Sequence, residues 1–329
     1  MPTPTSCPRR WATSARVLGL LSGYAADAAF GDPRRGHPVA AFGRVAQSAE
    51  GRLYADSRPR GAAYAAVLVG GAAVAGALLQ RAVEGSALAE AALVAAATWT
   101  VLGGRSLVAE ADAMSTLLDS GDTVGARRRL SHLCSRDATH LGPDELARAS
   151  VESVAENTSD AVVAPLLWGA AAGVPGLLAY RAVNTLDAMV GYRSARYLRF
   201  GWAAARTDDV VNWVPARVAA GLAVAAAPVV GGRSSRAWQV WRRDAAAHPS
   251  PNAGPVEAAF AGGLGVRLGG TSTYAGHRED RGVMDGGRPV QAADLDRAAR
   301  LSRLVGVGAL ALAALVAQVL ARQDDRRRG

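Results

Sequence analysis

The chain has 329 residues, half of them hydrophobic, and a formal net charge of +9. Aromatic residues make up only 5% of the sequence, and this dominance of small apolar residues favours close packing of helices in a bilayer over a β-sandwich. The sequence contains no Lys, which excludes a P-loop lysine and a lysine Schiff base, so a bound phosphate must be held by Arg, backbone N–H groups or a metal. The Arg residues are scattered between apolar stretches with few aromatic neighbours, which argues against nucleic-acid binding.

Several stretches are apolar enough to enter a membrane, and they are 17–30, 62–79, 87–102, 161–180, 218–230 and 304–320. A spanning helix needs about 20 apolar residues, a length that 62–79 and 304–320 approach. The stretch 161–180 contains Pro165 and a Gly-Val-Pro-Gly break at 173–176, so we predict that it is re-entrant or split into two short arms.

Two polar segments separate these stretches. Residues 105–150 have apolar side chains at helical spacing, and residues 233–299 are rich in Gly and Pro and are predicted to form a loop-dominated lobe. Basic loops beside apolar segments indicate a positive-inside topology. The sequence therefore predicts an all-α, polytopic integral membrane helical bundle, one membrane domain over 1–329, with both polar segments in the cytosol.

The most distinctive polar motif is Glu152-Ser-Val-Ala-Glu156-Asn157-Thr-Ser-Asp160. On a continuous helix, Glu152, Glu156 and Asp160 are four residues apart and share one stripe. Like charges at this spacing repel, so we expect a counter-charge, and Mg²⁺ is a natural one because it binds hard oxygens and substrate phosphates. The alternative is a solvated acidic face, but the position of the stripe directly before 161–180 favours a functional site.

Two further motifs place amides and carboxylates beside apolar segments. Asn184 and Asp187 share one helix face, with an exposed helix cap as the alternative. Asp208 and Asp209, followed by Asn212, form a second hard-oxygen cluster, although paired aspartates also occur at helix N-termini, where they interact favourably with the helix dipole.

Two proline-containing loops complete the set. His37 lies between Pro33 and Pro38 in a stiff turn and is a candidate for binding a phosphate or polarising a carbonyl, with a structural role as the alternative. Residues 248–255 precede a predicted helix start, whose N–H groups can hold an anion. The Gly-rich continuation at 262–270 is not a Walker A motif and is weak support for a nucleotide site.

The order and spacing of five motifs, covering about four-fifths of the chain, resemble the adenosylcobinamide-phosphate synthase family of cobalamin biosynthesis. The motifs are GDPRRGHPV at 31–39, ESVAENTSD at 152–160, YRAVNTLDAMVGY at 180–192, DDVVNWVPAR at 208–217 and SPNAG at 250–254. The chain departs from the family pattern at Arg181, where we expect Lys, and at Ala188, where we expect Ser. The resemblance implies an ATP- and Mg²⁺-dependent ligase that joins adenosylcobyric acid to aminopropanol phosphate, or to aminopropanol, through an amide bond.

This reaction suggests a role for each motif residue. The expected Mg²⁺ ligands are Glu152, Glu156, Asp160, Asp208 and Asp209, and all except Asp160 are also candidate catalytic groups. The expected phosphate-binding residues are His37, Arg181 and Arg217. Further expected substrate contacts are Asn157, Asn184, Asp187, Asn212, Ser250, Asn252 and Tyr274. The general base is left open among the carboxylates.

The resemblance also implies a location and partners. A single site requires all five motifs on one face of the bilayer, which we expect to be the cytosolic face of the cell membrane. The expected partners are the corrinoid, aminopropanol phosphate, membrane lipid and other proteins of the cobalamin pathway, without nucleic acid.

Two alternatives remain at this stage. Aspartate-rich helices with Mg²⁺ at a bilayer surface also occur in prenyl and CDP-alcohol transferases, but the signatures of those enzymes are absent here. Carboxylates within a membrane would suit an ion-coupled transporter, but most of the carboxylates lie outside the apolar stretches and no inverted repeat is evident.

Overall fold

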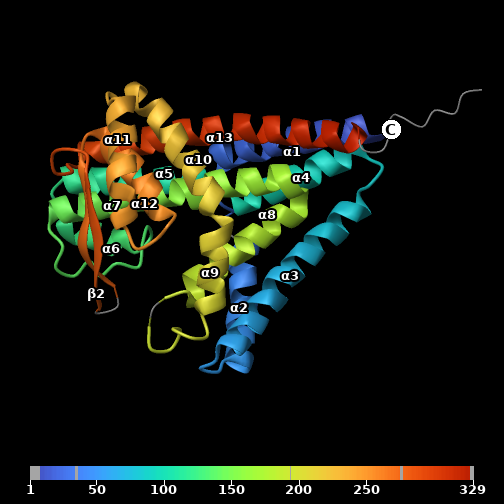
Figure 1. Ribbon diagram of the computed structural model, residues 1–329, viewed down its shortest axis with the longest axis horizontal. Helices are drawn as coiled ribbons and strands as arrows, with labels where there is room; N and C mark the ends of the chain where they lie inside the picture. The colour runs from blue at the N-terminus through green and yellow to red at the C-terminus, as the bar shows by residue number, and fades with distance from the viewer. Residues whose placement is uncertain (1–7, 34–35, 193, 275–276, 327–329) are drawn as a thin grey trace, which may run out of the picture. The chain divides into compact units, whose positions relative to one another are not determined.

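The computed structural model describes residues 8–33, 36–192, 194–274 and 277–326, and it is predominantly helical, which confirms the predicted all-α membrane class (Figure 1). Among the described residues, five helical stretches are long and apolar enough to cross a membrane: Arg58–Ala82, Ala87–Asp119, Pro143–Val190, Trp213–Val230 and Ala293–Gln323. The predicted stretch 17–30 lies in α1 (Pro8–Phe30) and is not among them.

Contacts within the chain cluster into two compact units, whereas the sequence predicted one domain. Unit 1 comprises residues 1–103, 164–211 and 310–329, and unit 2 comprises residues 104–163 and 212–309. Unit 1 contains α1, α2 (Pro38–Leu53), α3 (Arg58–Ala82), α4 (Ala87–Val101), α8 (Ala164–Val190), α9 (Trp202–Val211) and the end of α13 (Ala293–Arg326). Each unit has its own core, formed around Leu186 and Phe200 in unit 1 and around α12 (Ala253–Leu264) in unit 2.

Small residues bring the helices of unit 1 close together, as the composition suggests. A Cβ atom added at Gly19 or Gly23 of α1 would lie 2.5 Å from the Cβ atom of Val94 or Thr98 of α4, respectively. Real Cβ atoms do not approach this closely, so glycine at these two positions allows the helices to pack along a shared face.

The predicted break in 161–180 is confirmed at Gly173, which has φ +65° and ψ −146° and divides α8 into two arms, 164–172 and 174–190. The turn is held by Gln80 of α3, whose Oε1 accepts a hydrogen bond of 3.1 Å from the Val174 N–H. The two arms pack closely at Gly169 and Leu177, because a Cβ atom added at Gly169 would lie only 2.9 Å from the Leu177 side chain. Glycine is needed at 173 because L-amino acids with side chains rarely adopt a positive φ.

Unit 2 contains short helices and a hairpin that surround one buried helix. Its elements are α5 (Gly104–Asp119), α6 (Thr123–Leu130), α7 (Pro143–Thr158), the π-helical turn η1 (Ser159–Val163), α10 (Trp213–Ala226), η2 (Ala227–Val230), α11 (Ser234–Asp244), η3 (Ala245–Ala247), α12 (Ala253–Leu264), β1 (Arg267–Tyr274), β2 (His277–Asp285) and the start of α13. All twelve residues of α12 are buried. The strands β1 and β2 pair antiparallel, with an irregularity between Gly269 and Thr271.

Two expectations for unit 2 are corrected by the structure. The lobe predicted to be loop-dominated at 233–299 is instead built from α11, α12 and the hairpin, because α12 is apolar on every side and shows no helical periodicity that would distinguish it from a Gly-rich loop. The three-carboxylate stripe is also interrupted, because the π-helical turn begins at Ser159, so Asp160 does not continue the α-helical spacing of Glu152 and Glu156.

Candidate active site

Two of the predicted motifs and the first residues of a third, 208–211, lie in unit 1. His37 caps α2, where its Nδ1 accepts a hydrogen bond of 3.2 Å from the Val39 N–H. Arg181 and Asn184 are brought together on the second arm of α8, where the Arg181 Nη1 donates to the Asn184 Oδ1 over 3.3 Å. Asp187 accepts a backbone hydrogen bond from Gly191 at the end of the same helix. His37 therefore has the structural capping role that was its alternative reading, while its role toward a phosphate stays a prediction.

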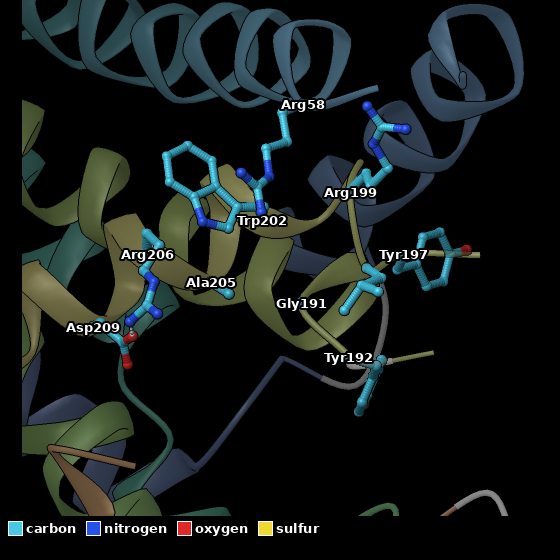
Figure 2. Close-up of a pocket in the computed structure, with 10 residues that line it drawn as sticks. Arg58, Gly191, Tyr192, Tyr197, Arg199, Trp202, Ala205, Arg206 and Asp209 are labelled. Carbon is cyan, nitrogen blue, oxygen red and sulfur yellow. Dashed lines mark hydrogen bonds and ion pairs between the residues drawn. The ribbon is translucent and has the colours of Figure 1, made fainter. Parts of the chain in front are cut away.

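The adjacent aspartates end α9, and Asp209 lines an open pocket of about 610 Å³ (Figure 2). The carboxylate of Asp209 accepts a hydrogen bond of 3.1 Å from Arg206, which also lines the pocket. Arg58, Arg199 and Trp202 also line the pocket. Like Arg206, none of them belongs to a motif identified from the sequence.

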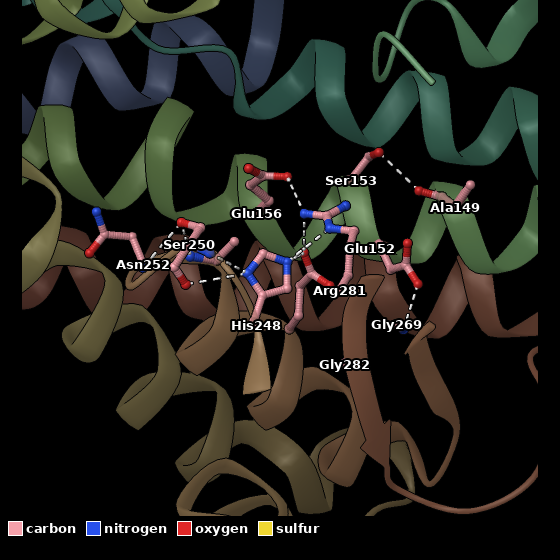
Figure 3. A network of polar contacts seen from close by, with 12 residues as sticks. Ala149, Glu152, Ser153, Glu156, His248, Ser250, Asn252, Gly269, Arg281 and Gly282 are labelled. Atoms are coloured by element: carbon pink, nitrogen blue, oxygen red, sulfur yellow. Dashed lines mark hydrogen bonds and ion pairs between the residues drawn. The ribbon is translucent and has the colours of Figure 1, made fainter. Parts of the chain in front are cut away.

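The other predicted residues lie in unit 2, where Glu152 and Glu156 border a network of charged side chains (Figure 3). Glu152 is 1% exposed and accepts hydrogen bonds from Arg136 over 2.6 Å and from the Gly269 N–H over 2.7 Å. Arg148 lies 3.5 Å from the same carboxylate and also donates to the Gly269 carbonyl oxygen. Glu152 thus joins α7 to the bulged start of β1 and places one negative charge between two guanidinium groups.

Arg281 of β2 occupies the centre of the network. Its Nη2 lies 3.1 Å from the Oε1 of Glu257 and 3.7 Å from the Oε2 of Glu156, and its Nε donates to the Nε2 of His248 over 2.9 Å. The Glu257 and His248 side chains are 0% and 1% exposed, whereas the Glu156 side chain is 41% exposed. Glu156 is therefore the point at which solvent or a substrate reaches an otherwise buried network.

Burial sets the protonation states of the buried pair. Burial raises the pKa of Glu257 to about 8, with the positive charge of Arg281 opposing this shift. Burial also lowers the pKa of His248 to about 4, and the charge of Arg281 lowers it further. At neutral pH Glu257 is consequently protonated and His248 is neutral. Because the His248 Nε2 accepts from Arg281, its proton is assigned to Nδ1, which lies 3.3 Å from the Ser250 carbonyl oxygen.

The turn before α12 carries two of the predicted substrate contacts. The Ser250 Oγ accepts hydrogen bonds from the N–H groups of Asn252 and Ala253 over 3.3 and 3.2 Å, and Asn252 is buried. The Ser250 backbone nitrogen also lies 3.0 Å from the His248 Nδ1, so this turn and the charged network form one structure. The structure thereby brings Ser250 and Asn252 into the same unit and the same neighbourhood as Glu156.

The remaining predicted residues of unit 2 have other surroundings. The Asn157 Nδ2 donates to the Ser153 carbonyl oxygen over 2.9 Å, and Asp160 lies in the π-helical turn. Asn212 is fully buried before α10, and the Arg217 guanidinium lies 4.0 Å from the centre of the Trp213 ring. Tyr274 ends β1, and its side chain lies outside the described part of the chain. The prediction that the motifs of both units form one site stays a prediction.

Sequence reasoning missed Arg136, Glu257 and Arg281 as members of the network. Glu257 carried a usable signal, since a single carboxylate in an otherwise apolar helix requires a partner when it is buried. Arg281 carried none, because it is one of many Arg residues and lies on a strand that the sequence did not predict.

The described residues offer few ligands for the expected Mg²⁺. No group of three or more His, Cys, Asp or Glu side chains is arranged to hold a metal ion in the described part of the chain. Glu152 is occupied by arginine, so its donor set does not suit a cation, whereas Glu156 and Asp209 each present a carboxylate at an accessible position. One or two such carboxylates suffice for a Mg²⁺ ion that arrives with nucleotide phosphates.

Comparisons with known proteins place the chain among relatives of one kind. The family model described as CobD/Cbib protein matches residues 20–302. The chain is 54% identical over 306 residues to the "Cobalamin biosynthesis protein CobD" of Mycobacterium tuberculosis strain H37Rv, covering 93% of this chain and 96% of the relative. A protein of the same description from Geobacter metallireducens is 44% identical over 78% of this chain and 82% of its own length. No solved structure matches the chain.

Proposed function

Because this chain belongs to the CobD/Cbib protein family, we propose that it acts in cobalamin biosynthesis as adenosylcobinamide-phosphate synthase. In this proposal it joins adenosylcobyric acid to aminopropanol phosphate, or to aminopropanol, through an amide bond and consumes ATP with Mg²⁺. The five candidate spans suit an enzyme of the cell membrane, with the site on the cytosolic side, where ATP is available. Other enzymes of the pathway are proposed partners.

The observation that carries the chemistry is the accessible carboxylate of Glu156 beside the buried Arg281–Glu257–His248 cluster. The carboxylate of adenosylcobyric acid is a poor acylating agent. One of its oxygens therefore first attacks the γ-phosphorus of ATP, which forms an acyl phosphate and releases ADP. The amine nitrogen then attacks the acyl carbon, the C–O bond to phosphate breaks, and inorganic phosphate departs with the bonding electrons. The neutral amine loses one proton as it becomes the amide, and a base must accept that proton.

Glu156 has the exposure to contact a substrate, and we assign it either as that base or as a carboxylate ligand to the Mg²⁺ of the nucleotide. Arg281 is a positioning residue, because its guanidinium lies 3.7 Å from the Glu156 carboxylate and is itself held by Glu257 and His248. When bound, Mg²⁺ would neutralise phosphate charge during phosphoryl transfer. Phosphate oxygens also require cations, for which Arg181 and Arg217 remain the candidates.

The test is an assay of the purified protein in detergent with adenosylcobyric acid, ATP, Mg²⁺ and either aminopropanol phosphate or aminopropanol. Mass spectrometry should detect an amide product that requires both ATP and Mg²⁺. Glu156→Gln should abolish turnover, whereas Asp144→Asn should retain it, because Asp144 is exposed in the first turn of the same helix and the charge change is identical. Absence of product from folded protein, or full activity of Glu156→Gln, would contradict the proposal.

A further inference from the structure

The pocket of unit 1 has a composition that the motifs do not explain. It is lined by Arg58 at the start of α3, by residues 191–192 and 197–199 that follow α8, and by α9 (Figure 2). Among the described residues that line it are three arginines, Arg58, Arg199 and Arg206, against a single acidic residue, Asp209. Three guanidinium charges against one carboxylate leave an excess of two positive charges, which is the charge that a phosphate monoester dianion would balance.

The backbone that carries Arg199 is anchored next to the pocket by a packed core. Phe200 is buried between Tyr54 and Tyr64, with ring centroids at 5.3 and 5.0 Å, and it packs in a core with Leu186 and Val190 of α8. Side chains larger than glycine are excluded on both sides of this core, since a Cβ atom at Gly61 or Gly201 would overlap the carbonyl oxygen of Phe200 or Val190.

The same segment is also tied by polar contacts outside the pocket. Arg196 lies 2.9 Å from Glu50 and stacks 4.0 Å from the Tyr54 ring, and the Tyr54 hydroxyl donates to the Arg196 carbonyl oxygen over 3.0 Å. The backbone that carries Arg199 and Trp202 is therefore held in place before any ligand arrives, which lowers the entropic cost of binding.

The arginines differ in how strongly they are engaged. Arg206 is paired with Asp209 at 3.1 Å, whereas Arg199 lies 3.8 Å from Asp56 with both side chains 59% exposed, a separation at which a surface pair contributes little. The Arg58 guanidinium lies 5.4 Å from the centre of the Trp202 ring, a cation–π contact that orients it without neutralising it. Arg58 and Arg199 therefore supply the excess charge, and guanidinium groups bind phosphate oxygens through paired hydrogen bonds.

We propose that this pocket binds the phosphate group of a phosphate monoester. Two sources share this chemistry: a small soluble phosphorylated substrate and the headgroup of a phosphomonoester lipid. The soluble source would be the phosphorylated amine, and this identification rests on the proposed function. Trp202 and Tyr192 are 43% and 46% exposed and give the organic part of the ligand an apolar surface.

The binding test uses phosphoethanolamine as the probe and ethanolamine as the probe without phosphate. Protein is placed in phosphatidylcholine nanodiscs, and binding is measured by calorimetry at low salt. Phosphoethanolamine should bind saturably and ethanolamine should not. Arg58→Gln and Arg199→Gln should each weaken binding about tenfold, or about 1.4 kcal/mol, because each removes a charged donor of hydrogen bonds to the phosphate.

The matched control is Arg60→Gln, which removes the same charge from an exposed position two residues along α3 that does not line the pocket, and it should bind like the wild type. Thermal unfolding of each variant checks its fold, and Arg199 provides a second, exposed position should Arg58→Gln fail to fold. Nanodiscs that contain phosphatidic acid separate the two sources. If phosphatidic acid competes with phosphoethanolamine, and this competition requires Arg58 and Arg199, the ligand is the lipid headgroup. If neither phosphoethanolamine nor phosphatidic acid binds, or if both arginine variants bind normally, the proposal is overturned.

The outcome is independent of catalysis, because the binding assay contains neither ATP nor corrinoid. If the wild type makes the amide but its pocket variants bind phosphoethanolamine normally, the pocket assignment is overturned and the proposed function stands. If the wild type makes no amide but the pocket variants lose phosphoethanolamine binding, the proposed function is overturned and the phosphate pocket stands. If both proposals hold, Arg199→Gln should raise KM for aminopropanol phosphate about tenfold and leave KM for aminopropanol unchanged.

Discussion

Replacement of Glu152 by Gln should destabilise the protein much more than replacement of Glu156 by Gln. Glu152 is 1% exposed, and its partner Arg136 is 2% exposed at 2.6 Å, so the substitution removes the carboxylate that pairs with a buried guanidinium. Breaking a buried ion pair at one partner costs about 3–5 kcal/mol. The amide of Gln can still accept one of the hydrogen bonds, so we expect a loss near the lower end, about 3 kcal/mol.

Thermal unfolding in detergent measures this difference. A loss of about 3 kcal/mol corresponds to a fall in Tm of roughly 6 °C at about 2 °C per kcal/mol for a large domain. Glu156→Gln should change Tm by less than about 2 °C, because its carboxylate is 41% exposed and lies 3.7 Å from Arg281. Equal Tm values for the two variants would refute the assignment of Glu152 as the counter-ion of Arg136.

A double variant separates charge from packing. Replacing both partners with apolar residues, Arg136→Met with Glu152→Leu, removes the unpaired charge and should recover much of the stability lost in Glu152→Gln. Failure of the double variant to recover stability would mean that the link from Glu152 to the Gly269 N–H, and not the ion pair, dominates.

Three further predictions concern pH, backbone conformation and metal. From pH 6.5 to 8 the free energy of unfolding should fall on the order of 1–2 kcal/mol. The pKa of Glu257 is raised to about 8, so the native state retains a proton that the unfolded chain has lost. His248, with a pKa lowered to about 4, opposes this trend only below pH 6.5. Glu257→Gln should flatten this dependence in urea titrations at several pH values, and an unchanged slope would contradict it. Gly173→Ala should lower stability by about 1–2 kcal/mol in thermal unfolding, because φ is +65° and the new Cβ atom would meet the Gln80 side chain. As the control, Gly70→Ala should be neutral or stabilising, because no atom lies within 4 Å of the Cβ position. Removal of Mg²⁺ with a chelator should stop amide synthesis with a Tm shift below about 1 °C, since the described residues form no metal cage, and a large fall in Tm would instead indicate a structural metal.

The sequence alone determined the membrane class and the position of the helix break. Long apolar runs are a local property of the chain, because the transfer of each segment into a bilayer depends on its own side chains. Gly173 and Pro175 likewise act on the backbone where they stand, so the division of α8 into two arms was predictable. The ordered motifs also indicated the family, which the comparisons show.

Only the tertiary structure decided which charges meet. Glu152 contacts the Gly269 N–H, 117 residues away, and Arg281 meets Glu257 and Glu156 from a hairpin that the sequence did not predict. Such pairs carry no periodicity, because a buried charge needs a partner of opposite sign from whichever element lies nearest in space, however distant it is along the chain. For this reason α7 was predicted to be functional from its carboxylates, while the buried position of one and the accessible position of the other became visible only in the fold.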